Sequence, residues 1–262
     1  MGDSRMPYRH ISSVILAMAT LMSSAHAAWL RPHQAVYDLS LATQTDEIIA
    51  VEGRIAYTLK AATCDEYEID YRFAARFHQQ DESTLTDQRT LSKESDGGNK
   101  FDFEIHTFVD GQDQGIVKGT AINEADSTAV AMVEPVQRKF ELPLSRFPLA
   151  HTSDLISRAQ KGERFVESRL FDGDVEAEKL VTTTSVILPA APGREETVKN
   201  LKSWRIDESY FNNDSNENGM PVFRARYRLY ENGVSDEMRL DFGDYELKGK
   251  LSDLTYLNGP AC

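Results

Sequence analysis

The sequence predicts a mainly β protein that carries one short helix. Apolar and polar residues alternate with a period of two through most of the chain, which is the pattern of strands with one buried face. Glycine-containing pairs such as Asp110-Gly111 and Asn232-Gly233 separate some of these runs and favour antiparallel hairpins. We expect roughly a dozen strands or more, and the absence of a fixed repeat period argues against a propeller or a solenoid.

The chain begins with the three zones of a secretory signal peptide. Arg5 and Arg9 lie in a basic start, residues 14–22 are an apolar core, and Ala25 and Ala27 form a small-x-small cleavage motif. A membrane-spanning helix needs about 20 apolar residues, so this shorter run favours removal over anchoring. We expect cleavage after Ala27 and export from the cytoplasm, with an uncleaved N-terminal anchor as the alternative.

The mature chain, residues 28–262, is predicted to be a single all-β domain, because a chain of this length can share one core. It is strongly acidic: 42 acidic and 29 basic residues give the whole chain a formal net charge of −13. Such a surface repels phosphate backbones and anionic headgroups, which argues against nucleic acid and against a peripheral membrane role. We also expect no membrane span in the mature chain, since no later segment is long and apolar enough.

The first half of the mature chain contains the clearest strand, residues 67–77. Every second residue from 67 to 77 is aromatic or apolar, and the residues between them are mostly charged. One face of this strand is therefore expected to cover a core. Residues 83–93 are polar and rich in threonine, which is typical of an exposed or edge strand. Further strands are predicted at residues 36–41, 55–59, 101–109, 115–123, 128–133, 136–142, 164–171, 179–188, 201–211, 223–229, 238–242 and 245–257.

One helix interrupts this pattern at residues 153–161. Ser153 is a suitable N-cap, Asp154 is an acidic residue in the first turn, and Gly162 follows where a left-handed C-cap residue would lie. The helix has a small apolar stripe at helical spacing. We therefore expect it to plug one opening of a curved sheet, with a role as a binding element as the alternative.

The sequence offers no catalytic site. His151, Ser153 and Asp154 are three residue types of a hydrolytic triad, but triad members converge from distant segments and Ser153 is better explained as a helix cap. The chain has no Gly-x-Ser-x-Gly elbow, phosphate-binding loop, dinucleotide fingerprint or His-Glu-x-x-His helix. We expect no catalytic residue, with a hydrolase as the least favoured function.

No cofactor or metal site is expected either. Residues 214–219 resemble the start of a calcium-binding loop, but the twelfth position holds Ala225 instead of a bidentate glutamate. A polar hairpin loop is the better interpretation, with weak adventitious calcium binding as the alternative. His33, His78 and His106 are scattered, so a metal site would have to be assembled entirely by folding.

The two cysteines, Cys64 and Cys262, favour a disulfide, because an even number of cysteines in an exported chain is typical of an oxidising compartment. Two unrelated buried thiols are the alternative. A zinc site with four cysteine ligands is excluded by the count.

Several segments together resemble the EipB-type cell-envelope integrity proteins, a periplasmic family of Gram-negative bacteria. The resemblance is carried by residues 32–39, 53–57 leading to Cys64, 85–89, 108–110, 164–166, 170–173 and 229–234, and by the final cysteine. It spans essentially the whole mature chain. The order of the segments and the positions of both cysteines make the combination fairly specific.

This resemblance implies an antiparallel, spiral-like open β-barrel with a disulfide between Cys64 and Cys262. It also implies a periplasmic role in envelope integrity and stress resistance, with no established enzymatic activity, cofactor or ligand. We expect a non-enzymatic protein that acts through contacts with another periplasmic or envelope protein. The alternative is a carrier of a lipid or other apolar ligand, since a curved sheet with an aromatic inner face encloses a cavity as readily as a packed core.

Overall fold

The computed structural model describes residues 30–173, 181–193, 196–212 and 219–260. The strands of the first half are β1 (His33–Leu41), β2 (Ala50–Thr63), β3 (Glu66–His78), β4 (Ser83–Ser95), β5 (Lys100–Val109), β6 (Gln112–Asn123), β7 (Ser127–Glu134) and β8 (Arg138–Pro143). The strands of the second half are β9 (Phe165–Leu170), β10 (Val181–Pro189), β11 (Ser203–Asn212), β12 (Phe223–Tyr230), β13 (Ser235–Asp241) and β14 (Glu246–Tyr256). A helix, α1 (Pro148–Gln160), connects the two halves, and a 3-10 turn, η1 (Asp96–Gly98), joins β4 to β5.

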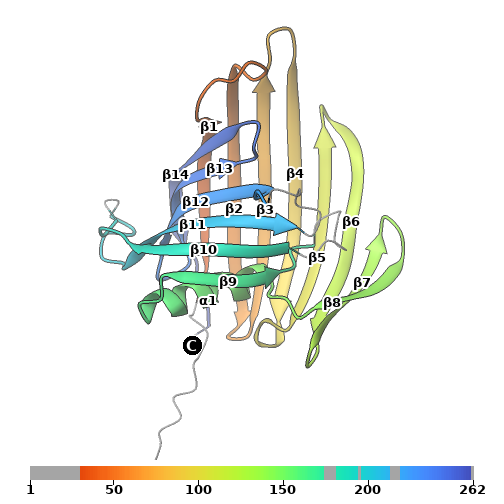
Figure 1. Cartoon of the computed structure of the whole chain (residues 1–262), viewed down its shortest axis with the longest axis vertical. Helices are drawn as coiled ribbons and strands as arrows, with labels where there is room; N and C mark the ends of the chain where they lie inside the picture. The colour runs from red at the N-terminus through yellow and green to blue at the C-terminus, as the bar shows by residue number, and fades with distance from the viewer. Residues whose placement is uncertain (1–29, 174–180, 194–195, 213–218, 261–262) are drawn as a thin grey trace, which may run out of the picture.

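All 14 strands belong to one antiparallel sheet, in the order β8-β7-β6-β5-β4-β3-β2-β1-β14-β13-β12-β11-β10-β9. Strand β1 lies near the middle and pairs with both β2 and β14. The first half therefore extends away from β1 on one side and the second half on the other. Figure 1 shows the second-half strands crossing in front of the long strands of the first half. The predicted mainly β fold with one helix is confirmed.

The sheet curls until its two edge strands, β8 and β9, approach each other. Arg146, just after β8, forms a parallel bridge to Leu170. The Arg146 backbone N–H donates to the carbonyl of Arg169 at 2.8 Å, and the Phe171 N–H donates to the carbonyl of Arg146 at 3.0 Å. The result is a nearly closed barrel, in agreement with the predicted open-barrel class.

An aromatic cluster packs beneath this junction. Phe147 and Phe171, on either side of the bridge, are both buried. Phe147 stacks on Phe101 with ring centroids 5.3 Å apart, and Phe171 meets Phe103 edge to face at 5.7 Å. Since Phe101 and Phe103 are consecutive inward-facing residues of β5, this strand supports the contact between the two edges.

Strand β4 corrects one prediction. It pairs along its whole length with β3 and β5, so it is an interior strand and the edge alternative was wrong. Its polar side chains are satisfied laterally: Asp87 accepts hydrogen bonds from Arg72 on β3 and from Arg89 on its own strand. The polar composition of β4 reflects the exposure of one face of the strand. A strand can have an exposed face while both of its edges are paired.

Helix α1 begins five residues before the predicted start. Pro148 occupies its first turn, and its fixed φ suits that position. Ser153 consequently lies inside the helix and is buried, and Asp154 accepts a hydrogen bond from Arg158 one turn later at 2.9 Å. The predicted cap and acidic first turn were wrong. The predicted end is confirmed, because Gly162 has a φ of +84°.

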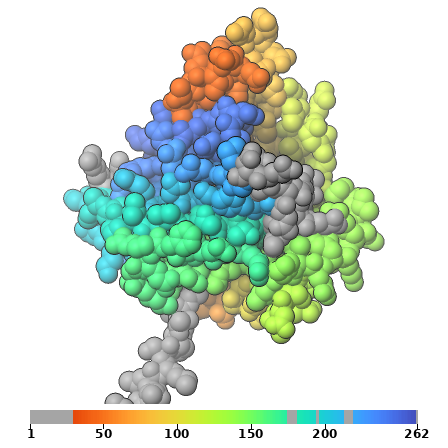
Figure 2. All heavy atoms as spheres, viewed as in Figure 1, coloured from red at the N-terminus to blue at the C-terminus, as the bar shows by residue number. Residues whose placement is uncertain are grey.

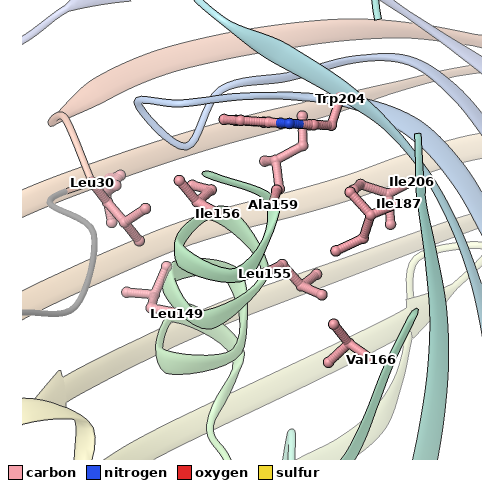
Figure 3. Close-up of a cluster of buried hydrophobic side chains, with 11 residues drawn as sticks. Leu30, Leu149, Leu155, Ile156, Ala159, Val166, Ile187, Trp204 and Ile206 are labelled. Atoms are coloured by element: carbon pink, nitrogen blue, oxygen red, sulfur yellow. The ribbon is translucent and has the colours of Figure 1, made fainter. Parts of the chain in front are cut away.

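Most apolar side chains of α1 point into the barrel. Figure 3 shows Leu149, Leu155, Ile156 and Ala159 surrounded by residues from both halves of the sheet. The surrounding residues include Leu30, Leu59, Val166, Ile187, Trp204 and Ile206. In Figure 1 the helix lies at the lower end of the barrel, behind β9 and away from the turn between β13 and β14. The helix thus fills one opening of the curved sheet, as predicted.

Candidate ligand cavity inside the barrel

A cavity of about 360 Å³ lies between the two halves of the sheet, next to α1. It is lined by inward-facing residues of β1, β2, β3 and β11 to β13, and by Pro148, Leu149 and Thr152 of the helix. Its volume falls in the lower part of the range of ligand pockets, which is about 300–1,000 Å³. Because strand side chains alternate between faces, the period-two pattern that identified the strands also selects these lining residues.

Five tyrosines give the cavity its chemical character. They are Tyr37, Tyr57, Tyr71, Tyr210 and Tyr227. Burial raises the pKa of Tyr71 to about 12. Burial also raises the pKa of Tyr57, and the charge of Glu94 adds to that effect. These phenols are therefore neutral at physiological pH and place hydroxyl groups on a mainly apolar wall.

His33 is another polar residue of the lining. It is buried at the start of β1, its Nδ1 lies 2.7 Å from the carbonyl oxygen of Arg31, and its ring packs on Tyr57 at 5.4 Å. Burial lowers its pKa, so it is neutral at pH 7. Within the described residues, the lining contains no lysine, arginine, aspartate or glutamate.

A buried carboxylate, Glu208 of β11, lies behind the tyrosines. It is 1% exposed and accepts hydrogen bonds from His151 Nε2 at 2.6 Å, from the Tyr227 hydroxyl at 3.0 Å and from the Ser185 hydroxyl at 3.1 Å. Burial alone would raise the pKa of this carboxyl, but the hydrogen bonds from His151, Tyr227 and Ser185 hold it below its usual value. Glu208 is thus an ionised and well-satisfied group in the barrel interior.

A second buried carboxylate, Glu94 of β4, holds the start of the helix. Its two oxygens accept hydrogen bonds from the backbone N–H groups of Leu149 and Ala150, at 2.6 and 3.0 Å. Burial raises the pKa of Glu94 to about 7, against the lowering effect of these two hydrogen bonds. A remote side chain therefore satisfies N–H groups that a local cap satisfies in most helices.

The three residues considered as a triad lie on α1, and two of them are paired with residues outside the set. His151 pairs with Glu208, whereas Asp154 pairs with Arg158. Glu208 was missed by the sequence reasoning, although it shares the inward phase of Trp204 and Ile206 along β11. An acidic residue at an inward position of an alternating strand was the available signal. Glu94 offered no comparable signal.

The histidines considered as metal ligands remain apart. His33, His78 and His106 lie on three different strands, and His106 pairs with Asp113 at 2.9 Å. No group of three or more histidine, cysteine, aspartate or glutamate side chains that could hold a metal ion occurs in the described part of the chain. Cys64 lies in the turn between β2 and β3. Cys262 and residues 214–218 of the calcium-like loop lie outside the described residues.

A larger hollow of about 440 Å³ is lined mainly by outward-facing residues of β2 to β6. Charged side chains dominate it, and several are already paired, as in Lys118 with Glu104 and Lys93 with Glu66. Exposed pairs of this kind interact weakly and are screened by salt. The inner cavity is therefore the better candidate for a ligand site.

A family assignment follows from a match over nearly the whole length of the chain. The model of the EipB-like family matches residues 24–258, from ahead of β1 to the end of β14. The chain belongs to the EipB-like family. It is 33% identical over 241 residues to the cell envelope integrity protein EipB of Brucella abortus, and the match covers 88% of this chain and 86% of that protein.

The fold of the EipB-like chain is also similar to a solved structure. A β-barrel-like protein of a domain of unknown function from Brucella abortus superposes with a TM-score of 0.84 at 31% identity. The match covers 88% of this chain and all of that structure.

Among the described residues, no helix has the length and apolar character to cross a membrane.

Proposed function

We propose that this EipB-like protein is a non-enzymatic periplasmic protein that supports cell-envelope integrity and resistance to envelope stress. The observation that carries the proposal is its 33% identity, over most of both chains, to a protein named for envelope integrity. The signal peptide zones in the sequence support a periplasmic location. The strongly acidic composition, with a net charge of −13, favours action away from anionic lipid surfaces.

The protein acts through contacts with another periplasmic or envelope protein. An exposed apolar patch on the outer face of β9 and β10, formed by Phe165, Val186 and Leu188, supports this mode of action. Phe165 is 59% exposed and pairs across the strands with Val186. These strands lie on the face shown in Figure 2, and β9 is an edge strand of the sheet. Exposed apolar groups beside a sheet edge are typical of protein-binding surfaces.

The test is a deletion strain challenged with detergent and with cell-wall antibiotics. We expect reduced survival relative to the parent, and recovery when the intact gene is returned. A Phe165→Asp variant, which places a charge in the apolar patch, should restore survival poorly while it accumulates to the normal level. A deletion strain that survives these stresses as well as its parent contradicts the proposed function.

The second candidate function is a carrier of a lipid or other apolar ligand, and the tyrosine-lined cavity is the observation that favours it. Native mass spectrometry of protein purified from its own envelope tests this candidate. A bound small molecule of reproducible mass supports a carrier. Repeated recovery of the unliganded protein removes this candidate and leaves action through protein contacts.

A further inference from the structure

A continuous series of aromatic rings leads away from the cavity. Tyr210 and Phe223, which line the cavity, have ring centroids 5.2 Å apart. Phe223 lies 5.0 Å from Phe242, which in turn stacks on Tyr245 at 5.0 Å. Phe77 completes the series at 5.5 Å from Tyr245. All of these distances fall within the range of favourable ring contacts, about 4.5–7 Å.

This series, the aromatic ladder, reaches solvent at the end of the barrel opposite α1. Phe242 is 39% exposed and lies beside the turn between β13 and β14. In Figure 1 that turn and the helix lie toward opposite ends of the barrel. The helix closes one end of the interior, and the ladder extends from the cavity wall toward the other end.

The surroundings of the cavity disfavour charge on whatever enters it. Within the described residues, no lysine or arginine lines the wall, and burial lowers the pKa of His33, the histidine of the lining. Two buried carboxyl groups lie close to the cavity wall and would repel an anion. Glu208 accepts a hydrogen bond from Tyr227, and Glu94 lies close enough to Tyr57 to raise the pKa of that phenol further. A neutral apolar chain or ring enters without the cost of removing a charge from water. An anionic ligand group buried there without a partner would be strongly unfavourable.

We propose that the cavity takes the uncharged end of a single apolar chain or ring, which enters along the aromatic ladder and leaves any charged headgroup in water beyond Phe242. The hydroxyls of lining tyrosines that do not bond to Glu208, such as Tyr57 and Tyr71, offer hydrogen bonds to a neutral polar group, such as an ester or an alcohol, on the buried part. This inference rests on the proposed carrier function and adds the route and the chemical class of the ligand.

Fluorescence titration of the purified protein with N-phenyl-1-naphthylamine, a neutral aromatic probe, tests the route. We expect saturable binding, and we expect Phe242→Ala to raise the dissociation constant roughly three- to tenfold through loss of ring contacts. Ile122→Ala is the matched control, since it removes an exposed apolar side chain of β6 that belongs neither to the cavity wall nor to the aromatic ladder. Ala225→Leu, which places a larger side chain on the cavity wall, should weaken binding further. Urea unfolding confirms that each variant folds.

Competition against the bound probe tests the chemical class. We expect 1-dodecanol and dodecanoate to displace the probe, because each has one uncharged end to insert. Dodecanedioate has the same chain with a carboxylate at both ends, and we expect it to compete at least about a hundredfold more weakly.

Three results overturn the inference: no probe binding to the wild type, equal effects of Phe242→Ala and Ile122→Ala, or equal competition by dodecanedioate and 1-dodecanol. Binding is measured on the isolated protein, whereas the envelope role is measured as survival of cells. If the protein binds no probe but restores survival, the cavity inference alone is refuted. If the protein binds the probe but its deletion causes no envelope defect, only the envelope role is refuted.

Discussion

Glu208 on β11 accepts a 2.6 Å hydrogen bond from Nε2 of His151 on α1, and both side chains are buried. The contact joins the helix to the second half of the sheet. It also supplies one of the donors that keep the Glu208 carboxylate satisfied in the barrel interior. The effect of replacing His151 and the response of the fold to acid both depend on this contact.

Replacing His151 with alanine leaves a buried carboxylate without its nearest donor. We expect the free energy of unfolding to fall by about 3–5 kcal/mol, since breaking a buried pair by removing one partner leaves an uncompensated charge. Arg158→Ala is the control, because it removes only partly exposed ion pairs, with Asp154 and Glu163, and should cost about 1 kcal/mol or less. Urea unfolding measures both, and similar losses in the two variants would contradict the assigned role of His151.

Glu208 should make the fold sensitive to acid. Its pKa in the folded state lies below its value of 4.5 in the unfolded chain, so its stabilising contribution is complete above that value and is lost as the pH falls further. Glu208→Gln should flatten the stability profile on the acid side of pH 4.5. The measurement is urea unfolding between pH 3 and pH 6, and an unchanged acid-side slope would argue against this assignment.

Glu94 should act in a different pH window and with the opposite sign. Its folded-state pKa of about 7 lies above the ordinary value of 4.5. Its ionisation is therefore favoured in the unfolded chain, and its contribution to stability is complete below pH 4.5 and is lost as the pH rises through 7. The full loss is on the order of 3 kcal/mol. Glu94→Gln should remove this decline when the free energy of unfolding in urea is measured between pH 4 and pH 8. A parallel decline in both proteins would contradict the role assigned to Glu94.

The predicted disulfide between Cys64 and Cys262 has a simple thermodynamic signature. Cys64→Ser and Cys262→Ser should each destabilise the oxidised protein by a similar amount, about 5 kcal/mol or less. The double variant should be no less stable than either single variant, because both remove the same bond. Thermal unfolding of the three proteins measures this. Additive losses would show that the two cysteines are not bonded to each other.

Gly53 tests the close packing of β2 on β3. A Cβ atom at this position would lie 2.7 Å from the Ala75 Cβ and 2.9 Å from the carbonyl oxygen of Ala74. Gly53→Ala should therefore lower the free energy of unfolding by about 1–3 kcal/mol. Ala75→Gly in the same chain should restore part of this loss, since it removes one of the two contacts. Stability of Gly53→Ala equal to that of the wild type would contradict this packing.

Local patterns predicted much of the fold. The alternation along residues 67–77 gave the correct inward face of β3, where Ala75 is buried and Tyr71 lines the cavity. The Asp110-Gly111 pair gave the hairpin between β5 and β6, and both residues have positive φ angles. These features depend on neighbouring residues alone, which is why the sequence is sufficient to predict them.

Features that depend on distant residues were missed. The start of α1 is set by Pro148 together with Glu94, whose carboxylate comes from β4. The closest donor to Glu208, His151, comes from the helix, whereas its other donors, Tyr227 and Ser185, lie on neighbouring strands. Whether the aromatic face of β3 packs fully or leaves a cavity depends on how far the sheet curves, and the alternation pattern contains no information on curvature.

The pairing of β1 with β14 has a consequence for the order of assembly. Every other pair of neighbouring strands in the sheet is consecutive in sequence, so those hairpins can form soon after each strand becomes available. The β1–β14 ladder, with partners such as His33 and Tyr256, requires almost the whole chain. The two halves of the sheet therefore stay unjoined until the last strand is available.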